Sequence, residues 1–241
     1  MKKFSFIFGL FLLMSINIFG LDFSAGGGVL AGYNFTRYTL EGGDTKSSQS
    51  MDRFNYAGFL FFDAKYVEFS VLIQGGNNSY KENMFLSESS LTDDKGTGYE
   101  TFLVFSLLGK YPFNINERVS LFPLFGVDYQ IALIERRTPD GGLEYNRSKG
   151  QGISAADVDK NGNNYPLHSW NAFWINVGGG LDFNFAGPFF LRSELIFGFR
   201  LPTGYELGAL EVFKKQFDVS NPKLAGLTGG PSFKVGVGYR F

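Results

Sequence analysis

Large apolar residues occupy every second position in repeated segments of about ten residues. The C-terminus shows this best, where Phe233, Val235, Val237, Tyr239 and Phe241 alternate with small or charged residues. A period of two is typical of a β-strand with one apolar and one polar face. The same pattern predicts eight strands, joined alternately by short turns and long polar connections, at residues 23–35, 53–63, 67–74, 100–111, 119–135, 173–185, 189–200 and 232–241.

The second face of these strands is rich in glycine and carries few charges of nearly balanced sign. A soluble β-sandwich would instead expose a face dense in charged residues. The other face is almost free of charge and is bounded by Phe and Tyr, as in a lipid-facing band with aromatic girdles. We therefore predict an all-β protein, an eight-stranded antiparallel up-and-down transmembrane β-barrel with long extracellular loops. Its expected interior charges are Arg53, Asp63, Glu68, Glu100, Lys110, Asp128, Asp182, Arg192, Glu194, Arg200, Lys234 and Arg240.

The composition excludes further classes of protein and partner. The 241 residues include 29 Phe, 32 Gly and no Cys. The formal net charge is −1, which weighs against a nucleic-acid partner. Structural disulfides and a lipoprotein anchor are excluded by the lack of cysteine.

The N-terminus predicts export. Lys2 and Lys3 precede an apolar run from residue 4 to 13, and a more polar stretch ends at Gly20. This order is typical of a signal peptide, and the run is too short for a membrane-spanning helix. Residues 1–20 are the predicted signal peptide and residues 21–241 the predicted barrel domain.

The last eight residues resemble the C-terminal β-signal of bacterial outer-membrane proteins. The matching positions are Lys234, Gly236, Tyr239 and Phe241 on the final strand. The resemblance implies recognition by the barrel-assembly machinery and insertion into an outer membrane. In size and strand number the chain resembles small eight-stranded barrels such as the OmpA membrane domain, OmpX and OmpW.

Four loops are expected at one end of the barrel, at residues 41–52, 77–98, 136–169 and 202–229. In the third, Asp157, Asp159 and Asn161 match the first ligand positions of an EF-hand loop and predict a Ca²⁺ site. His168 stands where that motif needs a bidentate Glu. The alternative is an Asx-rich turn that binds no metal.

Two other loop features bear on function. His168 is the only histidine and adjoins Ser169, but neighbouring residues on a strand point to opposite faces, so a surface lipase or acyltransferase is disfavoured. In the fourth loop Leu210, Phe213 and Phe217 have helical spacing. They predict a short helix that either lies on lipid headgroups or folds over the barrel mouth.

An eight-stranded barrel has an interior that side chains can fill. We therefore expect a non-enzymatic surface protein with no required cofactor, whose loops contact an unknown extracellular ligand and whose barrel is the anchor in outer-membrane lipid. The alternative is a narrow conduit for small, mostly apolar solutes. In that case glycines on the inner face would leave a cavity lined by Leu72 and Trp174.

Overall fold

The computed structural model describes residues 22–43, 45–86, 89–140, 145–148, 170–216 and 221–241. The predicted signal peptide lies outside this part of the chain. In the described part, no helix is both long and apolar enough to span a bilayer.

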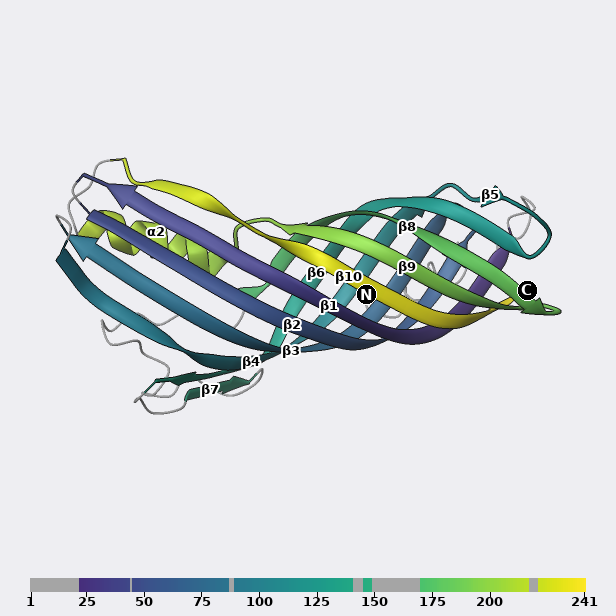
Figure 1. Ribbon diagram of the computed structural model, residues 1–241, viewed down its shortest axis with the longest axis horizontal. Helices are drawn as coiled ribbons and strands as arrows, with labels where there is room; N and C mark the ends of the chain where they lie inside the picture. Colours follow the sequence, from purple (N-terminus) through teal and green to yellow (C-terminus); the bar gives the residue numbers. More distant parts are fainter. Residues whose placement is uncertain (1–21, 44, 87–88, 141–144, 149–169, 217–220) are drawn as a thin grey trace, which may run out of the picture.

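Eight long strands form one antiparallel sheet that closes on itself (Figure 1). Each pairs with the next long strand along the chain, and the last pairs with the first, which confirms the predicted up-and-down barrel. Two short strands, β5 (Phe113–Asn114) and β7 (Tyr145–Ser148), pair with β6. In ring order the long strands are β1 (Phe23–Gly42), β2 (Thr45–Ala64), β3 (Val67–Leu86), β4 (Ser89–Lys110), β6 (Val119–Pro139), β8 (Ala172–Ala186), β9 (Phe189–Arg200) and β10 (Lys223–Arg240).

The two ends of the barrel differ. The end that we call the turn end carries the connections at residues 65–66, 111–118 and 187–188. Both described chain termini lie there, because the amide of Phe241 donates to the carbonyl of Phe23 at 2.9 Å. The opposite end, called the loop end, carries the connections around residues 43–44, 87–88, 140–171 and 201–222.

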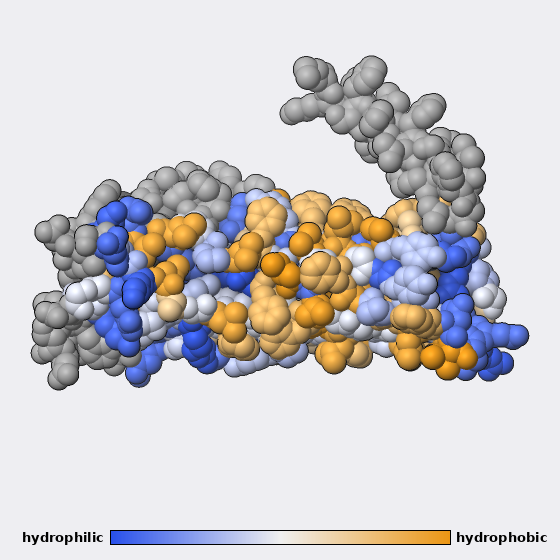
Figure 2. Space-filling model, turned by 90° about the horizontal axis from the view of Figure 1, so that it is seen from above, coloured by the Kyte–Doolittle hydropathy of each residue, from blue (hydrophilic) through white to orange (hydrophobic). Residues whose placement is uncertain are grey.

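The outer wall carries the apolar face predicted from the alternation. Figure 2 shows hydrophobic side chains over the middle of the barrel and hydrophilic ones toward both ends. Leu60 is 71% exposed and Leu195 is 61% exposed. A wall that faces water rarely exposes a continuous surface of such large apolar side chains. We call this surface the apolar belt; its outward-facing members include Val29, Phe54, Leu60, Ile73, Phe105, Phe125, Val177, Leu195 and Phe233.

The prediction of loops is wrong for two of the four segments, which the structure shows as paired strands. Gly42 pairs with Thr45, and Leu86 pairs with Ser89, so residues 41–52 and 77–98 are mostly continuous strand. Most residues of these two segments are polar, which removes the apolar alternation by which a strand is recognised, yet their backbones are still paired. The strands β2 and β3 therefore reach 20 residues each, whereas β9 has 12.

The helix α2 (Gly204–Gln216) occupies the fourth connection. It lies at the loop end beside β1 (Figure 1), and its Phe213 is only 3% exposed. Of the two predicted placements, the structure has the helix folded over the barrel mouth. Phe217 lies outside the described residues.

Candidate functional site

The charged side chains predicted for the barrel interior all lie on inward-facing positions. Arg192 and Glu68 are 2% and 1% exposed, and Asp128, Arg200 and Arg240 are partly exposed. Two groups form, separated along the barrel axis. The group that we call the turn-end ion cluster consists of Asp63, Glu68, Lys110, Asp182, Arg192, Glu194, Lys234 and Arg240.

Arg192 is the centre of the turn-end ion cluster. Its Nε and Nη2 donate to the two oxygens of Asp182, each at 2.8 Å, which is the bidentate geometry that a guanidinium favours. Its Nη1 donates to Glu68 Oε2 at 2.6 Å, and its Nη2 also donates to Asp63 Oδ2 at 2.7 Å. One side chain thus joins strands β2, β3, β8 and β9.

Phenyl rings surround this guanidinium. Its central carbon lies 4.7 Å from the ring centre of Phe61, 5.4 Å from that of Phe122 and 5.1 Å from that of Phe190. Inner-face glycines make room for the rings: a Cβ on Gly180 would lie 2.3 Å from Phe122, and one on Gly238 would lie 2.3 Å from Phe190. At these two positions, phenyl rings from neighbouring strands therefore fill the space that the missing side chains leave.

The remaining members close the turn end. Lys110 on β4 pairs with Asp63 on β2, with β3 between the two strands, and Lys234 Nζ lies 3.5 Å from Glu194 Oε2. Arg240 donates to Asn184 Oδ1 at 2.5 Å. Because these pairs connect several strands through the interior, the lumen at this end is filled with charged and aromatic side chains.

A small cavity lies between the two groups of charges. Its volume is about 40 Å³, and Leu72 and Trp174 line it, as expected from the sequence. Gly198 and Gly230 also line this cavity. Such a volume holds only a few water molecules.

Further ion pairs lie among the described residues at the loop end of the interior. Arg53 Nη1 lies 2.7 Å from Glu100 Oε2, and Arg200 pairs with Glu206 at the start of α2. Arg137 Nε lies 2.8 Å from Glu135 Oε1. The guanidinium of Arg137 stacks on Trp170 at 4.6 Å and on Tyr80 at 5.3 Å, which closes the mouth with planar groups.

Sequence reasoning missed Glu135 and Arg137 as interior charges. Asp128 and Gln130 face inward at even positions of β6, so simple alternation would place residues 135 and 137 outside. The pairing of β4 with β6 shifts between Thr101 and Phe102, leaving one extra residue in β6. This β-bulge reverses the facing of the residues beyond it.

Glu206 was also missed, although a local signal is present. Thr203 and Glu206 form a capping box, in which the Thr203 amide donates to Glu206 Oε2 at 2.6 Å. The Glu206 amide donates in turn to Thr203 Oγ1 at 3.4 Å. The spacing Thr-x-x-Glu after Pro202 is a recognised helix start and could have located α2.

Beyond the apolar belt, the outer wall carries exposed ion pairs. Arg37 Nη2 donates to Asp52 Oδ1 at 2.7 Å. Burial raises the pKa of Asp52, but hydrogen bonds from Arg37 and Tyr33 outweigh it and hold that pKa below its ordinary value. At the hairpin tip, a hydrogen bond from Lys46 lowers the pKa of Glu41.

The β-signal residues lie at the end of β10. Gly236 pairs with Gly28 of β1 and with Arg192 of β9, so the last strand is paired on both sides. Lys234 is buried, whereas Tyr239 and Phe241 are exposed on the outer wall and their rings meet edge to face at 5.4 Å.

The predicted Ca²⁺ ligands Asp157, Asp159 and Asn161, together with His168 and Ser169, lie outside the described residues. Within the described ranges, no group of three or more His, Asp or Glu side chains is arranged to hold a metal ion.

No family model and no curated protein matches this chain. Solved structures similar to it are outer-membrane β-barrels. The outer membrane protein OprG from Pseudomonas aeruginosa is 15% identical, the match covers 92% of this chain and 96% of OprG, and the TM-score is 0.36.

The N-terminal β-barrel domain of Pseudomonas aeruginosa OprF is 12% identical, with 90% of this chain and 99% of that domain covered and a TM-score of 0.36. Ail, the attachment invasion locus protein of Yersinia pestis, was solved with the heparin analogue sucrose octasulfate. It is 13% identical, with 90% of this chain and 99% of Ail covered and a TM-score of 0.30.

Proposed function

We propose that this chain is a non-enzymatic outer-membrane surface protein, in which the barrel is an anchor and the loop end is the part that meets an extracellular partner. The turn end would then face the periplasm, since short turns are periplasmic and long connections extracellular in such barrels. The β-signal residues would be read by the barrel-assembly machinery during insertion.

The observation that carries this proposal is the length of the strands. A tilted strand crosses a bilayer with about 9–11 residues. The 12 residues of β9 meet that need, whereas β2 and β3 have 20 and β4 has 22. About half of each long hairpin therefore extends beyond the bilayer as a paired, polar sheet, which a simple anchor does not require.

The filled interior weighs against the alternative, a conduit for small apolar solutes. Arg192 and its carboxylate partners occupy the turn end, and Arg53, Arg137 and Arg200 form ion pairs at the loop end. An apolar solute would have to pass buried charges at both levels, and the cavity between them is only about 40 Å³.

An insertion experiment tests the orientation. Gly43 lies at the tip of the first hairpin with a φ of 57°, and no atom lies within 4 Å of a Cβ added there. An epitope placed after Gly43 should bind antibody on intact cells. The matched insertion after Lys65, in a turn-end connection, should bind antibody only after the outer membrane is permeabilised. The reverse pattern would contradict the proposal.

Conductance tests the choice between anchor and conduit. The purified barrel in a planar bilayer should show no reproducible opening, and vesicles that contain it should take up a small apolar dye no faster than empty vesicles. Steady single-channel steps, or dye uptake that rises with the number of barrels per vesicle, would favour the conduit.

A further inference from the structure

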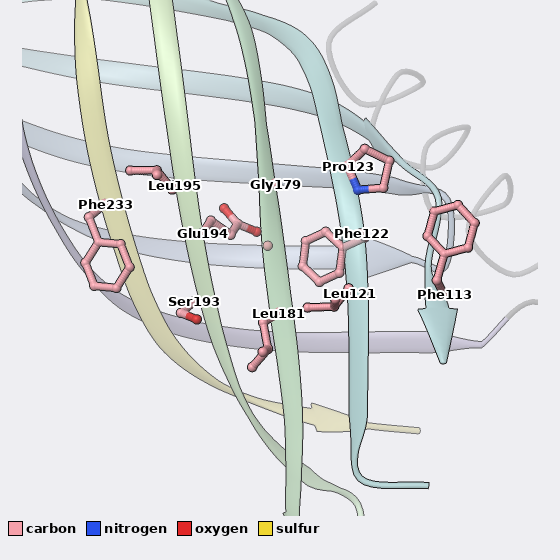
Figure 3. A pocket seen from close by; sticks show the side chains of 11 residues that line it. Phe113, Leu121, Phe122, Pro123, Gly179, Leu181, Ser193, Glu194, Leu195 and Phe233 are labelled. Atoms are coloured by element: carbon pink, nitrogen blue, oxygen red, sulfur yellow. The ribbon is translucent and has the colours of Figure 1, made fainter. Parts of the chain in front are cut away.

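A groove interrupts the apolar belt on the outer surface. Its volume is about 440 Å³, and it crosses β6, β8, β9 and β10 near the turn end, with Phe113 of β5 at one limit. Figure 3 shows Gly179 on β8 between Leu195 and Ser193 on β9 and Pro123 and Leu121 on β6.

The groove exists because two outward positions carry small residues. In the paired row Pro123, Gly179, Leu195 and Phe233, the glycine has no side chain, whereas Leu195 and Phe233 stand 61% and 49% exposed beside it. In the next row Ser193 is paired with Leu181 and is likewise short. The surrounding leucine and phenylalanine side chains are the walls of the groove.

The groove presents an apolar lining. Glu194 borders its floor, but that side chain points into the barrel and is only 1% exposed, so it contributes no charge to the outer surface. Ser193 supplies a hydroxyl and no formal charge. This chemistry fits a hydrocarbon chain and does not fit a charged or strongly polar ligand.

We propose that the groove is a seat for one acyl chain of a phospholipid from the leaflet next to the turn end. This inference rests on the proposed membrane anchor. Phe113 belongs to a turn-end connection and pairs with Leu121, so the groove opens within the half of the bilayer on that side. From β5 to β10 the groove crosses four strand spacings of about 4.8 Å, so it is about 19 Å long. Because it runs obliquely to the bilayer normal, its extent along that normal is comparable with half of the roughly 30 Å hydrocarbon core.

A flexible chain suits this shape better than a second copy of the barrel. The wall of a closed barrel is convex and its sheet is rigid, so it cannot enter a depression that is one side chain deep. A specific protein interface also needs about 1,000 Å² or more of buried surface, far more than a groove of this size offers. An acyl chain adapts by bond rotation and gains from each methylene group that it buries against the leucines.

Two glycines provide a matched pair of variants. A Cβ on Gly179 would lie 3.4 Å from the carbonyl of Phe122, an ordinary contact, so Gly179→Leu can fill the groove without displacing the backbone. Gly58 also faces the outer wall, and nothing lies within 4 Å of a Cβ placed there. Gly58→Leu therefore makes the same chemical change on the apolar belt, between Val29 and Ile73, away from the groove.

The experiment counts retained lipid. Wild type and both variants are folded into vesicles of phosphatidylethanolamine and phosphatidylglycerol and released into mild detergent, and the phospholipid bound to each barrel is measured by native mass spectrometry. We expect one phospholipid on wild type and on Gly58→Leu, and at least tenfold lower occupancy on Gly179→Leu. Equal occupancy in all three, or none on wild type, would overturn the proposal.

Two further readouts keep the result unambiguous. If Gly179→Leu fails to show the folded, heat-modifiable band on a gel, Ser193→Leu replaces it, because it fills the same groove from β9. A wild-type dimer that disappears in Gly179→Leu would assign the groove to a second copy and overturn the lipid seat. Flotation with vesicles separates the two proposals: a chain that does not float contradicts the membrane anchor, whereas one that floats without retained lipid contradicts only the seat.

Discussion

Arg192 Nη1 donates to Glu68 Oε2 at 2.6 Å, although 124 positions separate the two residues in the chain. Their strands, β9 and β3, stand on opposite sides of the ring, four strands apart in either direction. The two side chains joined by this bond therefore span the interior of the barrel from one side to the other. It fixes the distance between two walls that no backbone hydrogen bond joins directly.

Removing this guanidinium should destabilise the barrel strongly. We expect Arg192→Met to lower the free energy of unfolding by about 3–5 kcal/mol, because Asp63, Glu68 and Asp182 would lose a buried partner. Urea titration in vesicles measures the change. As a control, Arg37→Met breaks an ion pair whose side chains are 51% and 38% exposed, and it should cost less than about 1 kcal/mol. Similar losses in both variants would contradict the buried network.

A charge on the apolar belt should be costly. Leu195 is 61% exposed on the outer wall near the middle of β9, and Leu195→Arg should cost up to about 2–4 kcal/mol. Ser48→Arg, on the polar extension of β2, should change the free energy of unfolding by less than about 1 kcal/mol. The same urea titration compares them, and equal tolerance of both would remove the lipid-facing assignment.

The capping box should control α2 without controlling the barrel. Thr203 is 2% exposed, and its hydroxyl accepts from the Glu206 amide. Thr203→Ala should weaken the helix by about 0.5–2 kcal/mol. Limited proteolysis should then cut within residues 204–216 faster than in wild type, while the melting temperature of the barrel stays the same. A large fall in that temperature would show that α2 is needed for the strands themselves.

The terminal residue should affect insertion. Phe241 is 78% exposed and contacts Tyr239 on the outer wall. Phe241→Ser removes a large apolar group from the lipid-facing end of β10, so we expect a lower yield in the outer-membrane fraction. Immunoblots of fractionated cells measure this yield. Wild-type accumulation of the variant would argue against the β-signal interpretation.

The third connection offers a metal test that rests on the sequence alone. If Asp157, Asp159 and Asn161 bind Ca²⁺, the affinity should be weak, on the order of 10⁻⁴ to 10⁻³ M. Millimolar Ca²⁺ should slow proteolysis between residues 148 and 168, and the combined change Asp157→Ala and Asp159→Ala should abolish that protection. Identical cleavage under all four conditions would favour the Asx-rich turn.

Much of the fold follows from local alternation. A period of two, with apolar side chains on one parity and glycine or charge on the other, identifies eight strands and places residues such as Leu195 outside and Arg192 inside, because successive side chains on a strand must point to opposite faces. The alternation fails where most residues are polar, so the paired extensions of β1 to β4 look like loops in the sequence. Only their backbone pairing shows that they are strands.

The tertiary structure decided the rest, for reasons that lie outside any one strand. A single extra residue in β6 turns Glu135 and Arg137 into the barrel, and the shift is visible only in the register with β4. Inner glycines look like an open lumen in the sequence, yet rings such as Phe190, from a neighbouring strand, fill the space above them. Two partners of Arg192, Glu68 and Asp63, depend on ring closure, which brings them to Arg192 although more than a hundred positions separate them from it in the chain.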